Sequence, residues 1–204
     1  IDNFPVHRFT KVDGSIQEIF TGFNGQKFFD VIGNPSTSEI SKKLNKFDKF
    51  LPDGFKGEIS LRIDHWVQNL AETLTRGFIL TIDYGESSEI IYSPKFQNGT
   101  ITCFRQHFVN HEPYQFIGQQ DITSHVDFTF LENSGKKHGF KTLGYVSQRE
   151  FLTNLGFKNL LEELGSLEEL SEAQIELRRI AMSSLVDPLQ MGDFKVLIQC
   201  KKVE

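Results

Sequence analysis

The sequence predicts an α/β fold with a mostly parallel sheet, and two adjacent patterns carry this prediction. Residues 77–82 form an almost wholly apolar, partly β-branched run, which is typical of strands buried on both faces of a parallel sheet. Directly before it, residues 58–75 repeat apolar side chains every three or four positions, which predicts a helix with one apolar stripe. A helix that leads into a buried strand is half of a βαβ unit, so we expect this strand at the centre of the sheet.

Composition limits the class of protein. The 204 residues suffice for one sizeable core, so we expect a single domain over residues 1–204. The formal charge of −5 and the lack of a basic cluster argue against nucleic acid as a partner. Two distant cysteines, Cys103 and Cys200, provide neither a disulfide framework nor a zinc motif. No apolar stretch reaches the roughly 18 residues that span a bilayer.

The first third of the chain reads as a hairpin and a helix. Residues 15–22 and 26–32 flank Asn24-Gly25, a dipeptide typical of type I′ turns. Residues 37–51 are Lys-rich with helical spacing and close at a Pro-Asp-Gly turn, which we interpret as a peripheral helical insertion near residues 36–55.

The later elements follow from caps and periodicity. After an extended segment at 99–107, Asp121 is a good N-cap for a helix to about residue 137, because apolar residues follow it four apart. Ser171 and Gln174 form a capping box that begins another helix. The remaining predicted elements are a strand at 140–145, a helix at 148–155 that Gly156 ends, and a last strand at 194–200.

Asp83-Tyr84-Gly85 is the first candidate site. It ends the predicted buried strand, and ligands of open α/β sheets bind outside the carboxyl ends of the strands. Asp83 and Tyr84 would then place a carboxylate and a phenol in the catalytic crevice. The alternative is a structural turn in which Asp83 caps backbone amides and Gly85 takes a positive φ.

The polar landmarks together resemble the MidA-like family of S-adenosylmethionine-dependent methyltransferases. The motifs that carry the resemblance extend over nearly the whole chain: Asp2-Asn-Phe-Pro5-Val, Glu58 with Trp66, Ile82-Asp-Tyr-Gly85, Gly99-Thr100, His107, Gly118-x-x-Asp121-Ile-Thr-Ser-His125-Val-Asp127-Phe, Gln148-x-x-Phe151-Leu-x-x-Leu-Gly156 and Met191-Gly-x-Phe194-Lys-Val-Leu.

This resemblance implies a Rossmann-like class I methyltransferase fold whose last strand runs antiparallel to the rest. It implies S-adenosyl-L-methionine as cofactor, with Asp2 and Pro5 at the end of a strand that meets it; the alternative for these two residues is a frayed terminus. The family includes a mitochondrial complex I assembly factor that methylates a protein arginine. The resemblance therefore implies a protein substrate, such as a subunit of respiratory complex I. It places the protein in the cytoplasm if the source is bacterial and in the mitochondrial matrix if it is eukaryotic.

One departure from the family pattern matters. The family's glycine-rich cofactor turn lies upstream of the Asp-Ala-x-Pro-Val motif, and this chain contains no Gly-x-Gly. We therefore expect the carboxyl-terminal half of the fold, truncated at its amino terminus, with an exposed sheet surface that favours self-association into a homo-oligomer. The competing hypothesis is a non-catalytic interaction module that lacks the cofactor half.

Three further residues complete the predicted catalytic set. Asp121 and His125 are four apart on the predicted helix and would share a face across the crevice, with helix capping as the structural alternative. His107 follows the extended segment and would orient a carboxylate, unless it is a buried, hydrogen-bonded histidine.

The His125-x-Asp127 pair also has the spacing with which non-haem iron sites begin. That geometry needs an extended backbone, on which residues two apart face the same way. Because the segment is predicted to be helical, the two side chains would diverge, and we predict no metal site.

Overall fold

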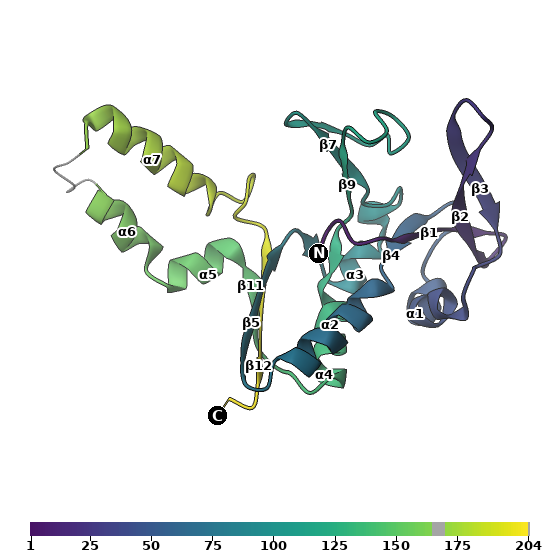
Figure 1. Cartoon of the computed structure of the whole chain (residues 1–204), viewed down its shortest axis with the longest axis horizontal. Coiled ribbons are helices and arrows are strands. Elements are labelled where there is room, and N and C mark those ends of the chain that lie inside the picture. The colour runs from purple at the N-terminus through teal and green to yellow at the C-terminus, as the bar shows by residue number, and fades with distance from the viewer. Residues whose placement is uncertain (165–169, 204) are drawn as a thin grey trace. The chain divides into compact units, whose positions relative to one another are not determined.

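The computed structural model describes residues 1–164 and 170–203 and contains two compact units. Unit 1 comprises residues 1–73 and 85–138, and unit 2 comprises residues 74–84 and 139–204. The chain passes from one unit to the other three times (Figure 1). The prediction of one methyltransferase domain stays a prediction.

Unit 1 is built around a four-stranded antiparallel sheet with the strand order β3-β2-β1-β4. Its strands are β1 (His7–Val12), β2 (Ser15–Phe23), β3 (Phe28–Gly33) and β4 (Lys56–Ile59). The predicted β2–β3 hairpin is confirmed, but its turn differs from the prediction. Asn24 N–H donates to the Lys27 carbonyl, so Gly25 and Gln26 form the loop. Only Gly25 has a positive φ (+92°), whereas a type I′ turn needs a positive φ at both loop residues.

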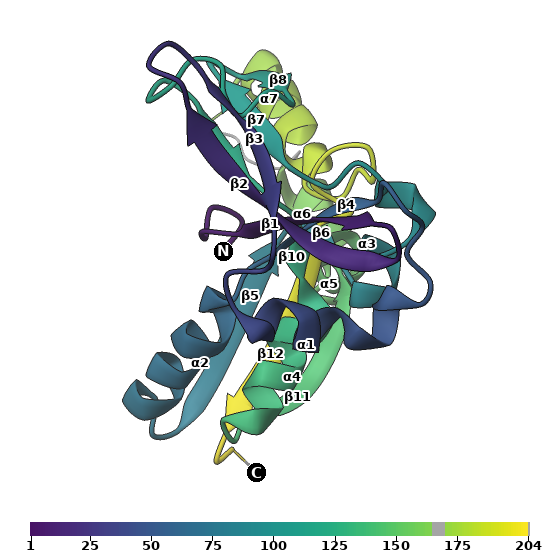
Figure 2. The same ribbon diagram turned by 90° about the vertical axis from the view of Figure 1, so that its right-hand side faces the viewer.

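Helix α1 (Ser38–Asp48) confirms the predicted helix, with Thr37 as its N-cap. It is not peripheral, however. Ile40 and Leu44 are completely buried and pack with Phe9 of β1 in the main hydrophobic cluster of the unit. Figure 2 shows α1 beside this sheet. The Lys-rich composition describes only the other face of the helix, which is why composition alone suggested an insertion.

Helix α2 (Arg62–Thr73) begins four residues later than predicted, because residues 56–59 form β4 instead of the first helical turn. Glu58 therefore lies on a strand and does not open a helix. The cause is antiparallel pairing with β1, in which Gly57 lies opposite Phe9. A strand of four residues is too short for its alternation to compete with the helical stripe that continues from Ile59 to Ile63.

The second part of unit 1 contains several short elements: β6 (Gly85–Glu86), α3 (Ser88–Ile91), η1 (Pro94–Phe96), β7 (Thr102–Arg105), β8 (Phe108–Asn110), β9 (Asp121–Thr123), β10 (Val126–Asp127) and α4 (Phe128–Lys137). The helix predicted from Asp121 is wrong over its first half: Asp121 lies in β9, which pairs with β7, and α4 begins at Phe128 with Asp127 as N-cap. A spacing of four residues fits both a helix and an alternating strand, and strand pairing decided between them.

Unit 2 contains a three-stranded sheet of the order β11-β12-β5, formed by β5 (Gly77–Asp83), β11 (Lys141–Ser147) and β12 (Lys195–Lys201). The neighbouring pair β11 and β12 is confirmed, and β12 runs antiparallel to both neighbours as expected. The prediction of a central parallel position for β5 is wrong: β5 lies at the edge of this sheet, and the named sheets are antiparallel apart from the β10–β6 pair.

The side chains of β5 show why the prediction failed. Phe78, Leu80 and Ile82 remain 60%, 51% and 44% exposed, whereas Thr81 is buried. The strand thus alternates, although its apolar composition suggested burial on both faces. The apolar composition of a strand shows that its side chains could be buried, but it does not determine which other elements cover them.

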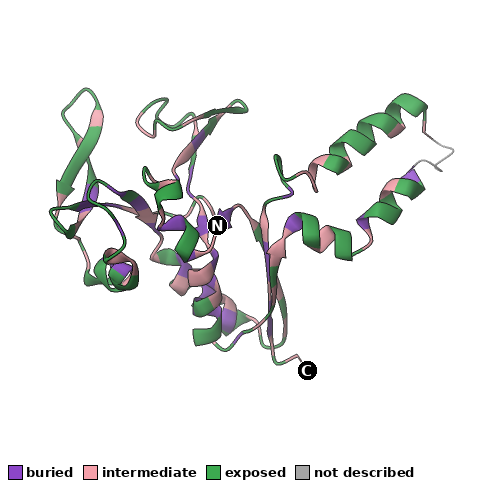
Figure 3. Cartoon of the chain, turned by 180° about the vertical axis from the view of Figure 1, so that it is seen from behind, coloured by how far each residue is buried: buried purple, intermediate pink, exposed green. Residues whose placement is uncertain are grey.

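Three helices complete unit 2: α5 (Gln148–Asn154), α6 (Phe157–Leu164) and α7 (Glu172–Ser184). The first and last were predicted, and the Ser171 capping box is present with both of its bonds. No described residue of α7 is buried, and the ribbon of this helix in Figure 3 is mostly green, the colour of exposed residues. Over the described parts of the chain, no helix has the length and hydrophobicity required to cross a membrane.

Candidate functional site

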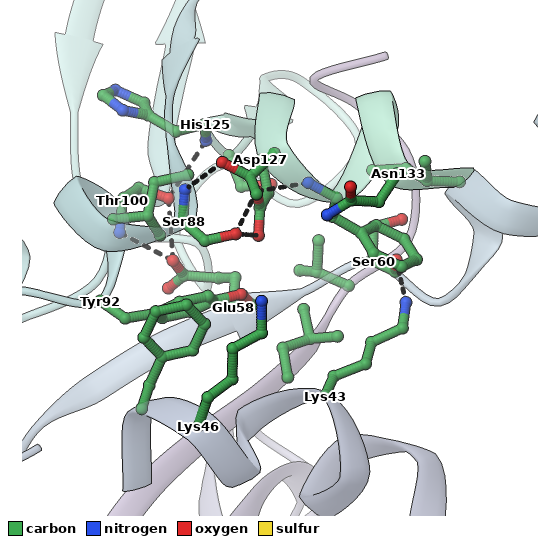
Figure 4. Close-up of a pocket in the computed structure, with 18 of the residues that line it drawn as sticks. Lys43, Lys46, Glu58, Ser60, Ser88, Tyr92, Thr100, His125, Asp127 and Asn133 are labelled. Carbon is green, nitrogen blue, oxygen red and sulfur yellow. Dashed lines mark hydrogen bonds between the residues drawn. The ribbon is translucent and has the colours of Figure 1, made fainter. Parts of the chain in front are cut away.

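A pocket of about 240 Å³ lies within unit 1 and is lined by six separate segments of the chain (Figure 4). Its polar wall comes from β4, α3, the segment before β7 and the segment around β10, while its opposite wall comes from α1. The polar groups used below are Lys43, Glu58, Ser88, Tyr92, Thr100, His125 and Asp127.

Glu58 enters the pocket from β4 and is held by Thr100. The backbone N–H and the hydroxyl of Thr100 each donate a hydrogen bond of 2.8 Å to Glu58 Oε2. Gly99 makes this approach possible, because its φ is +84° and a Cβ at this position would overlap Glu58 Oε1. Thr100 therefore holds the Glu58 carboxylate by hydrogen bonds, and Gly99 leaves the space that the carboxylate occupies.

Asp127 forms the second acidic group. As N-cap of α4 it accepts a 2.9 Å bond from Phe130 N–H, and the Ser88 hydroxyl lies 2.7 and 2.8 Å from its two carboxylate oxygens. These bonds fix the carboxylate orientation from two elements, α3 and α4.

Gly85 explains how Asp127 comes to this position. Strands β6 and β10 pair in parallel, with Gly85 opposite Val126 and Glu86 opposite Asp127. A Cβ on Gly85 would overlap the Val126 carbonyl, so only glycine permits this close approach. Gly85 does not have the positive φ that the structural alternative supposed. The role of Gly85 is to allow β10, the strand that carries Asp127, to pair closely with β6.

Both carboxylates are poorly solvated. Burial raises the pKa of Glu58 and that of Asp127 above their ordinary values, and the hydrogen bonds from Thr100 and Ser88 offset this only in part. Among the described residues no cation forms an ion pair with either carboxylate. Arg8, which lowers the Glu58 pKa from a distance, is itself bound to Asp30 at 2.6 and 3.1 Å.

Two further side chains set the character of the pocket. The hydroxyl of Tyr92, which is 9% exposed, donates to the Glu58 carbonyl at 3.2 Å, and burial raises the pKa of this phenol. On the α1 wall, burial lowers the pKa of Lys43 to about 8. A wall of two desolvated carboxylates therefore faces a lysine whose charge is itself destabilised.

Of the predicted site residues, His125 lines the pocket. Its backbone N–H donates to the Thr100 hydroxyl at 3.1 Å, and its ring meets Phe96 edge-on at 4.9 Å. Asp2 and Pro5 lie beside the pocket: the Asp2 carbonyl accepts a bond from Ser124, and the Pro5 carbonyl accepts one from Ser60.

Asp2 and Pro5 also line a hollow of about 220 Å³ that shares Val6 and Ser124 with the pocket. Sites for ligands of drug size have volumes of about 300–1,000 Å³. At about 220 Å³ this hollow is smaller than such a site.

Two predicted residues lie elsewhere in unit 1. Asp121 is exposed on β9 opposite Phe104, so it does not share a helix face with His125. His107 is exposed in the turn between β7 and β8, where Gln106 and His107 both have positive φ values, and it is therefore not a buried histidine. Their predicted catalytic roles stay predictions.

Asp83 and Tyr84 belong to unit 2. Asp83 ends β5 opposite Lys195, its Oδ1 accepts a 2.9 Å bond from Tyr84 N–H, and the Tyr84 ring lies 5.8 Å from that of Phe194. Their predicted catalytic roles likewise stay predictions.

The argument against a metal at His125-x-Asp127 used a helix that does not exist there, since β10 is extended. In the part of the chain that the structure describes, no group of three or more His, Cys, Asp or Glu side chains is placed to hold a metal ion.

Sequence reasoning underrated the two pocket acids and missed Lys43. Glu58 was assigned to a helix start, and Asp127 was considered only as a metal ligand. A signal for Asp127 exists: it stands directly before an apolar helical run, the position of an N-cap. No local pattern distinguishes Lys43 from the other lysines of α1.

Comparison with known proteins now identifies the family. Residues 1–146 match the family described as "Putative S-adenosyl-L-methionine-dependent methyltransferase". A protein arginine methyltransferase NDUFAF7 homolog, mitochondrial, from Drosophila melanogaster is 30% identical over 96% of this chain and 44% of its own length. The human protein arginine methyltransferase NDUFAF7, mitochondrial, is 24% identical over 94% of this chain and 41% of its own length.

A solved structure agrees. A COG1565 superfamily member from Burkholderia thailandensis, bound to S-adenosyl-homocysteine, has a TM-score of 0.88 and 27% identity and covers 100% of this chain and 52% of its own. The chain spans less than half the length of the curated relatives that it matches. By the match over residues 1–146, it belongs to the family of S-adenosyl-L-methionine-dependent methyltransferases.

Proposed function

We propose that the full-length protein is a methyltransferase that acts on a protein arginine, and that the pocket of unit 1 receives the acceptor side chain. The observation that carries this proposal is the pair of desolvated carboxylates, Glu58 and Asp127, with no cation paired to either in the described chain. A guanidinium between them would compensate the burial of their charge, and its planar donors match carboxylates in paired hydrogen bonds.

Lysine and amide nitrogens are the competing acceptors. An arginine is supported by the names of the relatives, which are 24–30% identical to this chain. It is also supported by the number of acceptor oxygens: Thr100 takes only Oε2 of Glu58, so Oε1 has lone pairs to offer to a fork of N–H donors.

The residues of the pocket would orient the acceptor and take up its proton. When bound, S-adenosyl-L-methionine supplies a methyl group on a sulfonium. Methylation of a guanidinium requires the loss of one N–H proton if the product is to keep a single positive charge. Glu58 and Asp127 have raised pKa values and so accept a proton more readily than ordinary carboxylates.

The other predicted residues retain proposed roles. Asp2 and Pro5 would contact the cofactor from the adjoining hollow, because Val6 and Ser124 line both spaces. Asp83, Tyr84, His107, Asp121 and His125 are proposed to orient cofactor or substrate. A complex I subunit as substrate and a mitochondrial location, if the source is eukaryotic, complete the proposal; the curated relatives are named as mitochondrial.

The test is methyl transfer by the full-length protein with labelled S-adenosyl-L-methionine. Two peptides that differ only by arginine or lysine at one position should be compared, and mass spectrometry should locate the label. We expect label on the arginine peptide alone. Label on lysine would overturn the arginine assignment. Binding of the arginine peptide without transfer would favour the non-catalytic interaction module instead.

A further inference from the structure

The pocket adjoins a second hollow on the surface of unit 1. This hollow has a volume of about 430 Å³ and lies between residues of α1, α2 and α4. Three residues line both spaces: Lys43, Phe130 and Asn133. They therefore form the partition between the pocket and the outer hollow, which we call the vestibule.

Lys43 makes two contacts within this partition. Its ammonium lies 3.2 Å from the centroid of the Phe130 ring. It also donates a hydrogen bond of 3.4 Å to the Ser60 carbonyl oxygen, which Figure 4 shows. A cation over an aromatic face is attracted by the electrons of the ring, and the same ring would attract the cation of a substrate. Lys43 thus occupies a place that suits a guanidinium or an ammonium.

No carboxylate in the described residues holds Lys43 in an ion pair, although several charged groups surround it. The groups that face it from α1, α2, α4, β4 and β10 are already engaged with other partners. Asp64 binds Lys137 and Ser134, Glu39 binds Lys42, Asp127 binds Ser88, and Glu58 binds Thr100. The other ionisable neighbours among the described residues are His65 in the vestibule, His125 and Tyr92 in the pocket, and Lys46 on α1.

Displacement of Lys43 would therefore break one ring contact and one long hydrogen bond, with no ion pair to separate. Burial already lowers the pKa of this lysine to about 8, so its charged form is held weakly near neutral pH. The side chain is long and flexible, which allows it to turn into solvent.

We propose that Lys43 is a displaceable cation that guards the passage from the vestibule to the pocket, so that the cationic side chain of the substrate enters between α1 and α4 and replaces Lys43 on Phe130. This inference rests on the proposed function, because it assumes a cationic acceptor. It makes Lys43 a specificity-determining residue, since a neutral side chain gains nothing by replacing it on the ring.

The pH dependence follows from the charge of Lys43. Below its pKa the lysine is a cation that competes with the substrate for the ring. As the pH rises through about 8 the lysine becomes neutral, and the competition ends. The affinity for an arginine side chain should therefore increase over this range.

The experiment is calorimetric titration of the full-length protein with acetyl-Gly-Arg-Gly-amide between about pH 7 and 9.5. We compare the wild type with Lys43→Met, Lys43→Arg and Lys49→Met, the last removing an exposed cation at the C-cap of the same helix. We expect the wild-type affinity to rise about tenfold across the range, which is the scale of one cation–π contact. Lys43→Met should bind about tenfold more tightly at pH 7 with little pH dependence, and Lys43→Arg should stay weak at every pH.

The outcomes separate the two hypotheses. If the wild type binds and Lys43→Met binds no more tightly, the guarding role is overturned while the proposed function stands. If neither the wild type nor Lys43→Met binds the peptide at any pH, both the guarding role of Lys43 and the proposed function are contradicted. A Lys49→Met protein that gains as much as Lys43→Met would show a general charge effect and would also overturn the role of Lys43.

A second readout uses the wild type and needs no variant to fold. Acetylation of Lys43 by acetic anhydride is measured by mass spectrometry, with and without the arginine peptide. The rate is measured as a function of pH, with Lys158, an exposed lysine of unit 2, as the reference for the reagent. Displacement into solvent removes the burial that lowers the pKa of Lys43, so bound peptide should move the midpoint of its pH profile upward from about 8. A midpoint that bound peptide leaves unchanged would contradict displacement.

Discussion

The hydrophobic centre of unit 1 and the sheet of unit 2 differ in how completely they enclose their apolar residues. In unit 1, Phe9, Ile40 and Leu44 have no exposed surface and come from a strand and a helix that lie far apart in sequence. In unit 2, Phe78 and Leu80 of β5 are 60% and 51% exposed. The apolar run that looked most deeply buried in the sequence is thus the less buried of the two.

The same contrast applies to the candidate sites. The pocket of unit 1 draws Glu58, Thr100 and Asp127 together from three distant segments, and glycines at 85 and 99 permit the close approaches. Asp83 and Tyr84 of unit 2 are neighbours in sequence, at the end of one strand. The comparison teaches that a compact motif is easy to recognise in a sequence, whereas a buried pocket depends on long-range pairing.

The largest expected effect tests the difference in burial. Leu44→Ala removes a fully buried side chain and should destabilise the protein by about 2–5 kcal/mol. Leu177→Ala removes one that is 68% exposed on α7 and should change the free energy of unfolding by no more than about 0.5 kcal/mol. Urea denaturation of both variants gives the comparison. If both variants lost the same free energy of unfolding, Leu177 of α7 would be packed in solution, and the predicted difference in burial between the two residues would be wrong.

The next effect concerns the strand-end site. Asp83→Asn should lower methyl transfer by the full-length protein about a hundredfold, as when a positioning or electrostatic group is lost. The unfolding midpoint should stay nearly unchanged, because Asn can still accept the bond from Tyr84 N–H. If stability falls while the folded fraction keeps its activity, Asp83 is a structural cap, and the functional interpretation of this motif is wrong.

The smallest effect concerns the pH dependence of stability in unit 1. The pKa of Glu58 is higher in the folded protein than in the unfolded chain, so its carboxylate costs stability once it ionises. The wild type should therefore lose stability as the pH rises from the unfolded pKa, near 4.5, through the folded one. Glu58→Gln keeps an acceptor for Thr100 and should lose less over the same range.

Thermal unfolding at several pH values would check this prediction, with Glu89→Gln as a control for an exposed carboxylate. The wild type and Glu58→Gln should differ little at low pH and diverge in favour of the variant toward neutral pH. A difference that is constant with pH would mean that the Glu58 carboxylate is not desolvated.

Local signals predicted much of the fold. The β2–β3 hairpin, α1, α5, α7 and the adjacent strands β11 and β12 follow from turns, caps and alternation that a few residues encode. The errors arose where a pattern fits two structures. The spacing Ile122, Val126, Phe130 suits a helix or a strand, and the short strand β4 continues the apolar stripe of α2.

The candidate site was less predictable. The family resemblance implied site roles for Asp2, Pro5, Asp121 and His125. Of these, His125 lines the pocket and Asp2 and Pro5 line the adjoining hollow, whereas Asp121 is exposed on β9. Desolvation of Glu58 and Asp127 depends on distant segments meeting in space: Glu58 and Thr100 are 42 residues apart, and Ser88 and Asp127 are 39 residues apart. No local pattern contains that information.

The central claim is that the buried acids of unit 1 hold the methyl acceptor. Its most direct test is the kcat/KM of the full-length protein for an arginine peptide, measured for the wild type, Asp127→Asn and Glu89→Gln. Asn is an equally good N-cap, so Asp127→Asn should fold normally and remove only the charge. We predict a loss of about a hundredfold for Asp127→Asn and little change for Glu89→Gln. A folded Asp127→Asn protein with wild-type kcat/KM would contradict the account.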